Sequence, residues 1–217
     1  MSRPAAAARR THKGEYIETD TGNKISRKSH IDGKQHIMLG GRTVVMAGVQ
    51  MRGDLCRVAE KSSDGGAEKE GPTTAIAVGS VDVEIMVQRG TIISTNSVLR
   101  PPMRLSRGQM TCYPMRMGDN IFIGPGSHIS AASISSHVYI GANCVLSPFC
   151  VIKESCKILP NTVVPPHMIV PPGSIVAGRP GRIIGEVGDG WGQGGGGGEG
   201  EEWVEGGDLR PLVRSIK

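Results

Sequence analysis

The chain has 217 residues, which is enough for one sizeable domain with tails, and its formal net charge is +5. Aromatic residues make up only 3% of the sequence, which disfavours a conventional core rich in rings and favours a narrow aliphatic core. No apolar run approaches the length of a membrane span, so we expect no direct insertion into a membrane. The five cysteines, without a secretory signal, indicate a reduced, cytosolic setting.

The charge is unevenly distributed along the chain. Residues 185–208 contain seven acidic residues and neither Lys nor Arg, which leaves 25 basic residues against 13 acidic ones elsewhere. A basic body attracts acidic partners of any class, although the same charge is also compatible with ordinary solvation of a protein surface. No interleaving of aromatic and basic residues suits the stacking of single-stranded nucleic acid, so we expect no nucleic-acid partner.

The N-terminal part begins with a basic segment and then enters a loose repeat. Residues 1–13 contain four Lys or Arg residues and an alanine run, and we expect a disordered tail there rather than a transit peptide. From residue 14 onward we expect short strands with a six-residue period. The positions of this period are Ile25, Ile31, Ile37, Thr43, Val49 and Leu55.

Two interruptions of the repeat follow. Residues 59–80 begin with a polar run and are predicted to form a loop extruded from the coil. Val81, Val87, Ile93 and Leu99 are again six apart, so the coil is expected to resume, although residues 81–88 lack turn residues and fit the pattern least well. Residues 100–114 contain no hexad and are predicted to form a second, basic loop that leaves the coil.

The most regular part of the sequence lies between residues 117 and 176. Aliphatic residues or Met recur at every sixth position, with one five-residue step, and mostly small residues follow each of them four positions later. This hexapeptide signature predicts short strands joined by corners, with the large side chains inside a triangular prism. The large positions are Met117, Ile123, Ile129, Ile134, Ile140, Leu146, Ile152, Ile158, Val164, Val170 and Val176.

Three hexads complete one coil, so residues 18 positions apart are predicted to stack at the spacing of neighbouring strands, about 4.8 Å. Such a repeat predicts a parallel solenoid, but the repeat itself does not determine the handedness. The expected inner ladders are Ile140–Ile158–Val176, Leu146–Val164 and Ile152–Val170.

The repeat ends near Gly181, so we expect the coil to occupy residues 14–184. Residues 185–207 are rich in Gly and Glu and are predicted to be disordered. The last ten residues can form one short amphipathic turn, which Pro211 keeps from becoming a long helix. The segment 185–217 is therefore interpreted as a disordered tail with a short C-terminal element.

The histidines give little support for a catalytic metal. A zinc site of the carbonic anhydrase type needs three convergent histidines, and neither His30 nor His36 has a histidine 18 positions later. His128 and His137 lie nine residues apart and lack a close histidine pair, although either of them could act as the base of an acyltransferase. No other feature indicates a coenzyme site, so we expect no catalytic residue, metal or cofactor.

Two further motifs are interpreted as structural. The turn Arg52-Gly53-Asp54 looks like one found in carbonic anhydrases of the hexapeptide class, but a structural ion pair or a simple turn is the favoured interpretation. Cys144, Cys150 and Cys156 are six residues apart, which places them on three different faces of one coil. They cannot converge on one ion, so we expect them to pack in the core.

Four stretches are more specific than the hexads. They are Glu15-Tyr16-Ile17-Glu18-Thr19 with Gly22-Asn23-Lys24, Met51-Arg52-Gly53-Asp54-Leu55, Ser97-Val98-Leu99-Arg100-Pro101-Pro102, and Cys156-Lys157-Ile158-Leu159-Pro160-Asn161-Thr162-Val163. Together with Val164-Pro165-Pro166 and Val170-Pro171-Pro172, these stretches resemble the dynactin subunit 5 family over about residues 14–184. The segment at about 59–90 and the acidic tail depart from the family pattern.

The resemblance implies an all-β fold, a single-stranded left-handed parallel β-helix of hexapeptide repeats. It implies a non-catalytic scaffold or adaptor subunit of the pointed-end complex of dynactin, in the cytoplasm and on the microtubule cytoskeleton. The implied partners are a second β-helical subunit, an actin-related protein, dynactin subunit 4 and the cargo adaptors of dynein, and the implied process is transport of cargo such as early endosomes. A hexapeptide-repeat enzyme, either an acyltransferase or a zinc carbonic anhydrase, remains the alternative.

The candidates for a contact surface are residues outside the hexad pattern that are either charged or next to rigid prolines. They lie in the basic loop 100–107 and in the corners from residue 167 to residue 172. The predicted interaction residues are Arg100, Pro101, Pro102, Arg104, Arg107, His167, Pro171 and Pro172.

Overall fold

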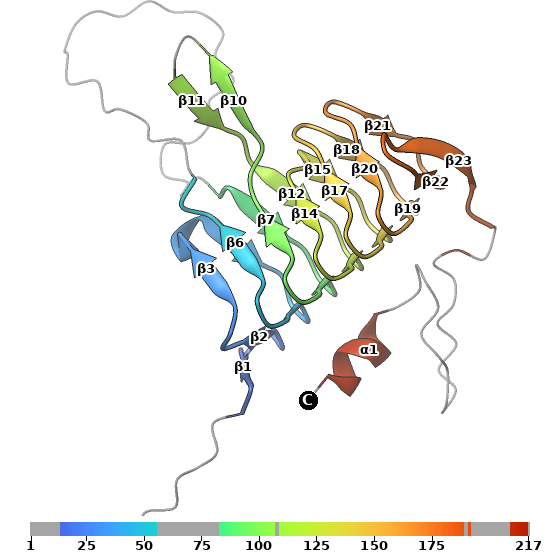
Figure 1. The fold of residues 1–217 in the computed structure, drawn as a ribbon. Coiled ribbons are helices and arrows are strands. Elements are labelled where there is room, and N and C mark those ends of the chain that lie inside the picture. The colour runs from blue at the N-terminus through green and yellow to red at the C-terminus, as the bar shows by residue number, and fades with distance from the viewer. Residues whose placement is uncertain (1–13, 56–82, 107–108, 189–190, 192–208, 217) are drawn as a thin grey trace, which may run out of the picture.

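The computed structural model describes residues 14–55, 83–106, 109–188, 191 and 209–216. Its short strands form three parallel sheets, A, B and C, which are the walls of a triangular prism (Figure 1). The chain visits the walls in the order A, B, C in every coil, and the fold is the expected left-handed parallel β-helix. The predicted fold class is therefore confirmed.

Sheet A is the longest wall, and the strand at each of its two ends runs antiparallel to its neighbour. β1 pairs with β2 at one end and β23 pairs with β22 at the other, while the strands between them are parallel. In spatial order its strands are β1 (Tyr16–Glu18), β2 (Lys24–Ser26), β5 (Val44–Val45), β8 (Ile92–Ile93), β13 (Phe122–Ile123), β16 (Tyr139–Ile140), β19 (Lys157–Ile158), β22 (Ser174–Ala177) and β23 (Arg182–Glu186).

Sheets B and C have six strands each, and all their pairings are parallel. Sheet B consists of β3 (His30–Asp32), β6 (Gln50–Arg52), β9 (Val98–Leu99), β14 (His128–Ile129), β17 (Val145–Leu146) and β20 (Val163–Val164). Sheet C consists of β4 (Ile37–Leu39), β7 (Ile85–Val87), β12 (Met115–Met117), β15 (Ser133–Ile134), β18 (Val151–Ile152) and β21 (Ile169–Val170).

The predicted inner ladders form the core of the prism. Ile140 lies opposite Ile158 and Ile158 opposite Val176, and all three side chains are buried. The other two predicted ladders have the same registers, Leu146 with Val164 and Ile152 with Val170. Each strand therefore turns one aliphatic residue inward and the residue before it outward, as the period of two in a strand requires.

The corners are set by residues with a left-handed backbone conformation. Positive φ angles recur at every sixth residue through two coils, with values between 55° and 64°. Asparagine tolerates this conformation better than most residues, and β-branched residues tolerate it poorly. The corner residues in this run are His137, Asn143, Phe149, Ser155, Asn161 and His167.

The expected register of the first coil is wrong by two residues. Ile25 lies opposite Val45 and Ile31 opposite Met51, so Thr43 and Val49 do not occupy the inner ladder although both are buried. A short 3-10 helix, η1 (Lys34–His36), lies between β3 and β4 and lengthens this coil. Beyond it both Ile37 and Leu39 face the core, where Ile37 stacks on Ile85 and Leu39 stacks on Val87, so the six-residue step onward to Val45 starts from Leu39.

The coil resumes within the segment that fits the hexad pattern least well. Ile85–Val87 forms β7, which pairs with β4 on one side and with β12 on the other. Val87, Ile93 and Leu99 are buried in the core, as their six-residue spacing predicts. The predicted first loop, residues 59–80, and Val81, the first predicted position of the resumed repeat, lie outside the described residues.

The predicted second loop leaves the coil and contains a β-hairpin. β10 (Met103–Ser106) and β11 (Gln109–Cys112) are antiparallel and project from the corner between sheets B and C (Figure 1). The other departures from the six-residue step, which are η1, the long connection from β6 to β7 and the five-residue step from Ile129 to Ile134, fall at the same corner. In the described coils, the corners between A and B and between C and A keep the six-residue step.

The C-terminal part departs from the expected boundary at residue 184. β23 continues to Glu186, because its backbone pairs with β22 across sheet A. Residues 192–208 and 1–13, which were predicted to be disordered, lie outside the described residues. The short C-terminal element is a helix, α1 (Arg210–Ser215), which packs against sheet A, and no described helix is long and apolar enough to cross a membrane.

Truncation of an inner residue should destabilise the chain far more than truncation of the same residue type on the outside. Ile140→Ala leaves a cavity in the prism and should lower the free energy of unfolding by about 2–5 kcal/mol. Ile169→Ala removes a side chain that is 64% exposed, so its effect should stay near zero. Urea unfolding followed by circular dichroism measures both values, and equal losses would contradict the assigned register.

Candidate protein-interaction surface

The outer face of sheet C is largely apolar and has one charged position. Four of the six outward residues that pair along this sheet are large and apolar, one is a serine, and only Arg116 carries a charge. Ile169 at the far end is one of the most exposed large hydrophobic residues described. The outward ladder is Met38, Met86, Arg116, Ser133, Val151 and Ile169.

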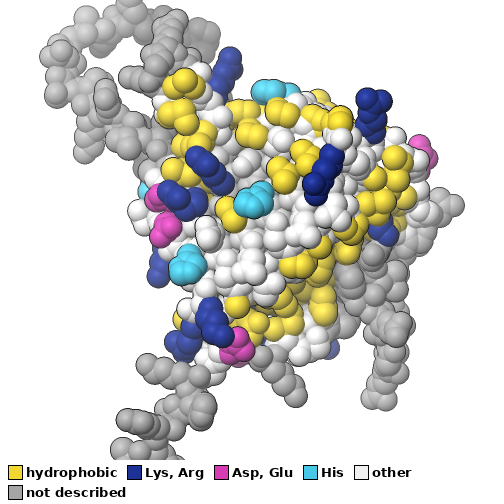
Figure 2. All heavy atoms as spheres, viewed as in Figure 1, with side chains coloured by type: hydrophobic (Ala, Val, Ile, Leu, Met, Phe, Trp, Pro, Cys, Tyr) yellow, Lys and Arg dark blue, Asp and Glu magenta, His cyan; other side chains and the backbone are white. Residues whose placement is uncertain are grey.

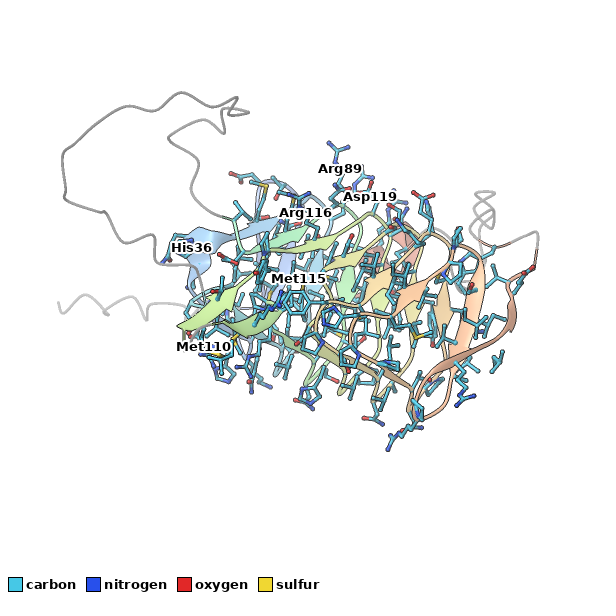
Figure 3. All side chains as sticks on the ribbon, turned by 90° about the horizontal axis from the view of Figure 1, so that it is seen from above. His36, Arg89, Met110, Met115, Arg116 and Asp119 are labelled. Atoms are coloured by element: carbon cyan, nitrogen blue, oxygen red, sulfur yellow. The ribbon has the colours of Figure 1, made fainter. Side chains whose placement is uncertain are left out.

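The hairpin adds exposed apolar side chains beside this wall. Leu105 and Met110 face each other across β10 and β11 and are 66% and 61% exposed. Arg104 is exposed on the same hairpin, opposite Thr111. Figure 2 shows hydrophobic side chains on the hairpin and along the adjoining edge of the prism, and Figure 3 labels Met110 on the hairpin and Met115 and Arg116 on the strand that follows it. Such exposed apolar side chains in one region are typical of a protein contact.

Three rings form a ladder along the edge between sheets B and C. Tyr113, directly after the hairpin, meets Phe149 edge-on with ring centroids 5.3 Å apart. His167 stacks flat on the other side of Phe149, also at 5.3 Å. Phe149 and His167 are corner residues 18 positions apart, so the coil repeat itself produces their stack. The ladder connects the base of the hairpin with the last complete coil.

The predicted loop residues divide into exposed and buried ones. Arg100 and Arg104 are exposed, and a guanidinium nitrogen of Arg100 lies 3.6 Å from the Sδ atom of Met103. Pro101 and Pro102 are buried, so in this chain they shape the exit of the hairpin and do not line its surface. Arg107 lies outside the described residues.

The predicted corner residues lie on the two sides of β21. His167 precedes the strand at the edge between sheets B and C, and Pro171 and Pro172 follow it at the edge between sheets C and A. All three are exposed. They are three coils away from the hairpin, which corresponds to about 14 Å along the prism axis. The structure thus arranges the exposed predicted residues around the outer face of sheet C.

Sequence reasoning missed the apolar part of this surface. Leu105, Met110 and Tyr113 lie in a segment without a repeat, so no periodicity indicated their pairing. Met38 and Ile169 stand directly before inner residues, and this position always points outward. Large apolar residues at this outward position were the feature of the sequence that could have indicated the apolar surface.

The histidines do not come together. His30 lies opposite Gln50, not the expected Gly48, because the first coil is lengthened, and His128 lies between Val98 and Val145. His128 is on sheet B, whereas His137 is at the corner between sheets C and A, and the carbonyl of His137 accepts a hydrogen bond from Nε1 of Trp191 at 3.1 Å. Among the described residues no three His, Cys, Asp or Glu side chains are placed to hold a metal ion.

The Arg52-Gly53-Asp54 turn is a bidentate ion pair. Nε and a terminal nitrogen of Arg52 donate to the two carboxylate oxygens of Asp54 at 2.7 and 2.8 Å. These hydrogen bonds lower the pKa of Asp54 below its usual value. The pair fixes the turn after β6, as the structural interpretation expects.

Comparison with known families agrees with these features. The sequence model described as Dynactin subunit 5 matches residues 74–192, which are 119 of the 217 residues. The chain belongs to the dynactin subunit 5 family. Dynactin subunit 5 of Dictyostelium discoideum is 38% identical over 124 residues, which are 57% of this chain and 49% of that protein. The chain therefore spans about half the length of this curated relative of the family.

Solved structures share the fold of this member of the dynactin subunit 5 family at low identity. AntD, an N-acyltransferase from Bacillus cereus, was solved as a point mutant with dTDP and coenzyme A. It is 13% identical, with a TM-score of 0.53, over 77% of this chain and 83% of that one. AntD with dTDP and 3-hydroxybutyryl-CoA is 14% identical, also with a TM-score of 0.53, over 76% and 80%. Identities this low support the common β-helix alone.

The three hexad cysteines of this family member are packing residues, as predicted. All three are buried at successive corners, and Sγ of Cys144 and of Cys156 each donates to a backbone carbonyl one coil further on, at 3.1 Å. Burial raises the pKa of all three thiols, and that of Cys150 to about 12. A thiol with a raised pKa holds little thiolate at neutral pH and is a poor nucleophile or metal ligand.

Alkylation should distinguish these cysteines from Cys112, which is only half-buried. At pH 8, which is well below the raised pKa of Cys150, about one molecule in ten thousand carries this thiolate, so iodoacetamide should modify it extremely slowly. Peptide mass spectrometry should find Cys112 modified first and Cys144, Cys150 and Cys156 modified only after unfolding in guanidinium. Equal labelling of all four in the native chain would contradict the core placement.

Proposed function

We propose that the chain is a non-catalytic scaffold subunit of the pointed-end complex of dynactin. The observation that carries this proposal is the match of the family model to more than half of the chain. In this role the protein helps dynein–dynactin engage cargo, including early endosomes, for microtubule-based transport, and it resides in the cytoplasm on the cytoskeleton. Its partners are a second β-helical subunit, an actin-related protein, dynactin subunit 4 and the cargo adaptors of dynein.

The two ends of the prism support stacking on another β-helical subunit. Within the described part of the chain, β3 and β4 at one end, and β20 and β21 at the other, have a hydrogen-bonded neighbour strand on one side only. Open edges of parallel sheets attract further strands, and proteins usually cap or pair them. β1 and β23, the end strands of sheet A, also have one described neighbour each but run antiparallel, so we expect a stacked parallel coil to extend sheets B and C.

The outer face of sheet C and the hairpin support side-on contacts. The exposed pair Leu105 and Met110 gives the hairpin an apolar face, and Arg104, the neighbour of Leu105 in β10, gives its other face a positive charge. The corners with His167, Pro171 and Pro172 bound the same wall at its other end. We assign this surface to partners within the complex or to adaptors.

Affinity purification from cell extract tests the assembly role. A tagged full-length chain should recover the other dynactin subunits at stoichiometric levels, as measured by quantitative mass spectrometry. Arg104→Glu should reduce this recovery several-fold without a change in thermal stability, because it reverses an exposed charge on the hairpin. Arg214→Glu, an exposed position on α1 against a different wall, is the matched control and should behave as wild type.

Two outcomes would count against the proposal at different levels. No recovery of dynactin subunits with the wild-type chain would overturn the assembly role. Full recovery with Arg104→Glu would leave the assembly role intact and remove the hairpin from the contact surface.

Zinc and coenzyme measurements separate the scaffold from the enzyme alternative. We expect elemental analysis of the purified chain to find less than one zinc per ten chains, and calorimetry to detect no binding of coenzyme A at millimolar concentration. These expectations rest on the dispersal of His30, His128 and His137 over different walls and corners. One zinc per chain, or saturable coenzyme A binding, would favour a hexapeptide-repeat enzyme.

A further inference from the structure

The outer face of sheet A carries an apolar cluster that is separate from the core of the prism. Val44 and Ile92 point outward from neighbouring strands, yet both are fully buried. They are covered by Leu209 and Val213 of the C-terminal segment, which are 1% and 7% exposed. Figure 1 shows α1 against this wall, on the opposite side of the prism from the hairpin.

The covering segment has the pattern of an amphipathic helix. Leu209, Leu212, Val213 and Ile216 follow the spacing i, i+3, i+4, i+7, which places them on one face of a helix. Arg214, outside this pattern, is exposed. The partly buried residues that border the cluster are Tyr16, Met46, Phe122, Leu212 and Ile216.

A lysine of the prism adds a polar contact at the end of the helix. Nζ of Lys24 donates hydrogen bonds to the carbonyl oxygens of Val213 at 3.3 Å and Ile216 at 2.5 Å. Carbonyls in the last turn of a helix have no partner within the helix, and a cation there also interacts favourably with the helix dipole. The wall therefore recognises both the apolar face and the C-terminal end of a helix.

The helix that occupies this wall is intrinsically weak. α1 has six residues, and isolated helices shorter than about 12 residues are marginal in water. It belongs to no sheet and contributes nothing to the inner ladders. Its separation from the wall is therefore a local opening that leaves the prism folded.

A tether keeps α1 close to the wall. Trp191 is anchored on the same side of the prism, because its Nε1 bonds the carbonyl of His137 and its ring centroid lies 5.8 Å from Nζ of Lys157. Between Trp191 and Leu209 there are 17 residues, nine of them Gly. A connection of 17 residues is long enough to cover the roughly 14 Å across the three strand spacings from β16 to β5. Because α1 belongs to the same chain as the wall, its binding to the wall is intramolecular.

We propose that the outer face of sheet A is a docking site for an amphipathic helix of a binding partner, and that α1 holds the site until such a helix displaces it. The partner helix presents aliphatic residues at the spacing of Leu209, Leu212, Val213 and Ile216 and ends at Lys24. A longer partner helix has the advantage in binding this wall that it is more stable as a helix than α1. The advantage of α1 is that it belongs to the same chain as the wall. This inference goes beyond the assembly role and does not depend on it.

A labelled peptide of residues 207–217 tests the exchange on the purified full-length chain. In fluorescence anisotropy it should bind Leu209→Ser/Val213→Ser at least tenfold more tightly than wild type, because the double substitution frees the wall from its own helix. Arg214→Ser is the matched control and should bind the peptide as wild type does. Adding Ile92→Ser to the double variant should abolish binding, since this substitution alters the wall itself.

Equal binding of the peptide by the wild type and the double variant, or no binding by either, would overturn the proposal. Hydrogen exchange on the wild-type chain gives a test that needs no variant. The amide of Val213, which donates to the carbonyl of Leu209 at 2.9 Å, should exchange at least a hundredfold faster than the amide of His128, which donates to Cys144 inside the prism. Equally slow exchange would also overturn the proposal, because α1 would then open only with global unfolding.

Discussion

One packing constraint governs the whole molecule, namely that each wall of the prism offers the interior at least one large side chain per coil. Ile140, Ile158 and Val176 satisfy it in register and without exposure. A strand that slipped by a single residue would turn its aliphatic side chain outward and its polar neighbour inward. The six-residue step is therefore kept at the corners between sheets A and B and between sheets C and A, and the departures from it are confined to the corner between sheets B and C. This is why a chain with so few aromatic residues still has a continuous close-packed core.

The departures are not spread evenly over the corners. Four departures lie between sheets B and C, namely η1, the long connection from β6 to β7, the hairpin and the five-residue step from Ile129 to Ile134, while the other two edges are regular in the described coils. One edge of the prism is thus free to vary without disturbing the inner ladders. The hairpin and the ladder of Tyr113, Phe149 and His167 occupy that edge, which puts the exposed side chains of Leu105 and Met110 at the border of sheet C.

The sequence predicted the structure accurately only where the six-residue repeat of inner positions continues without insertions or deletions. Residues 117–176 were predicted to the register, because their inner positions are uniformly aliphatic. The first coil was displaced because η1 adds two residues, and Thr43 and Val49 are also compatible with a core. The stack of Phe149 on His167 follows from their separation of 18 residues in the sequence. The contact of Tyr113 with Phe149 could not be predicted in this way, because Tyr113 follows the hairpin segment, which has no repeat. The apolar character of α1 was predictable, but its docking wall was not, since Val44 and Ile92 occupy ordinary outward positions of the repeat.

The three walls therefore serve different purposes. Sheet A ends on both sides in an antiparallel strand and is covered in part by α1, whereas sheet C and its edge toward sheet B are exposed. A close-packed prism of this kind has no second arrangement of its core, so changes in binding have to come from the elements outside it. The hairpin and α1 are those elements, and each is attached by few contacts compared with the strands. The hairpin and α1 lie on different walls of the prism. A partner that binds the hairpin therefore leaves α1 in place, and a helix that displaces α1 leaves the hairpin free to bind a second partner.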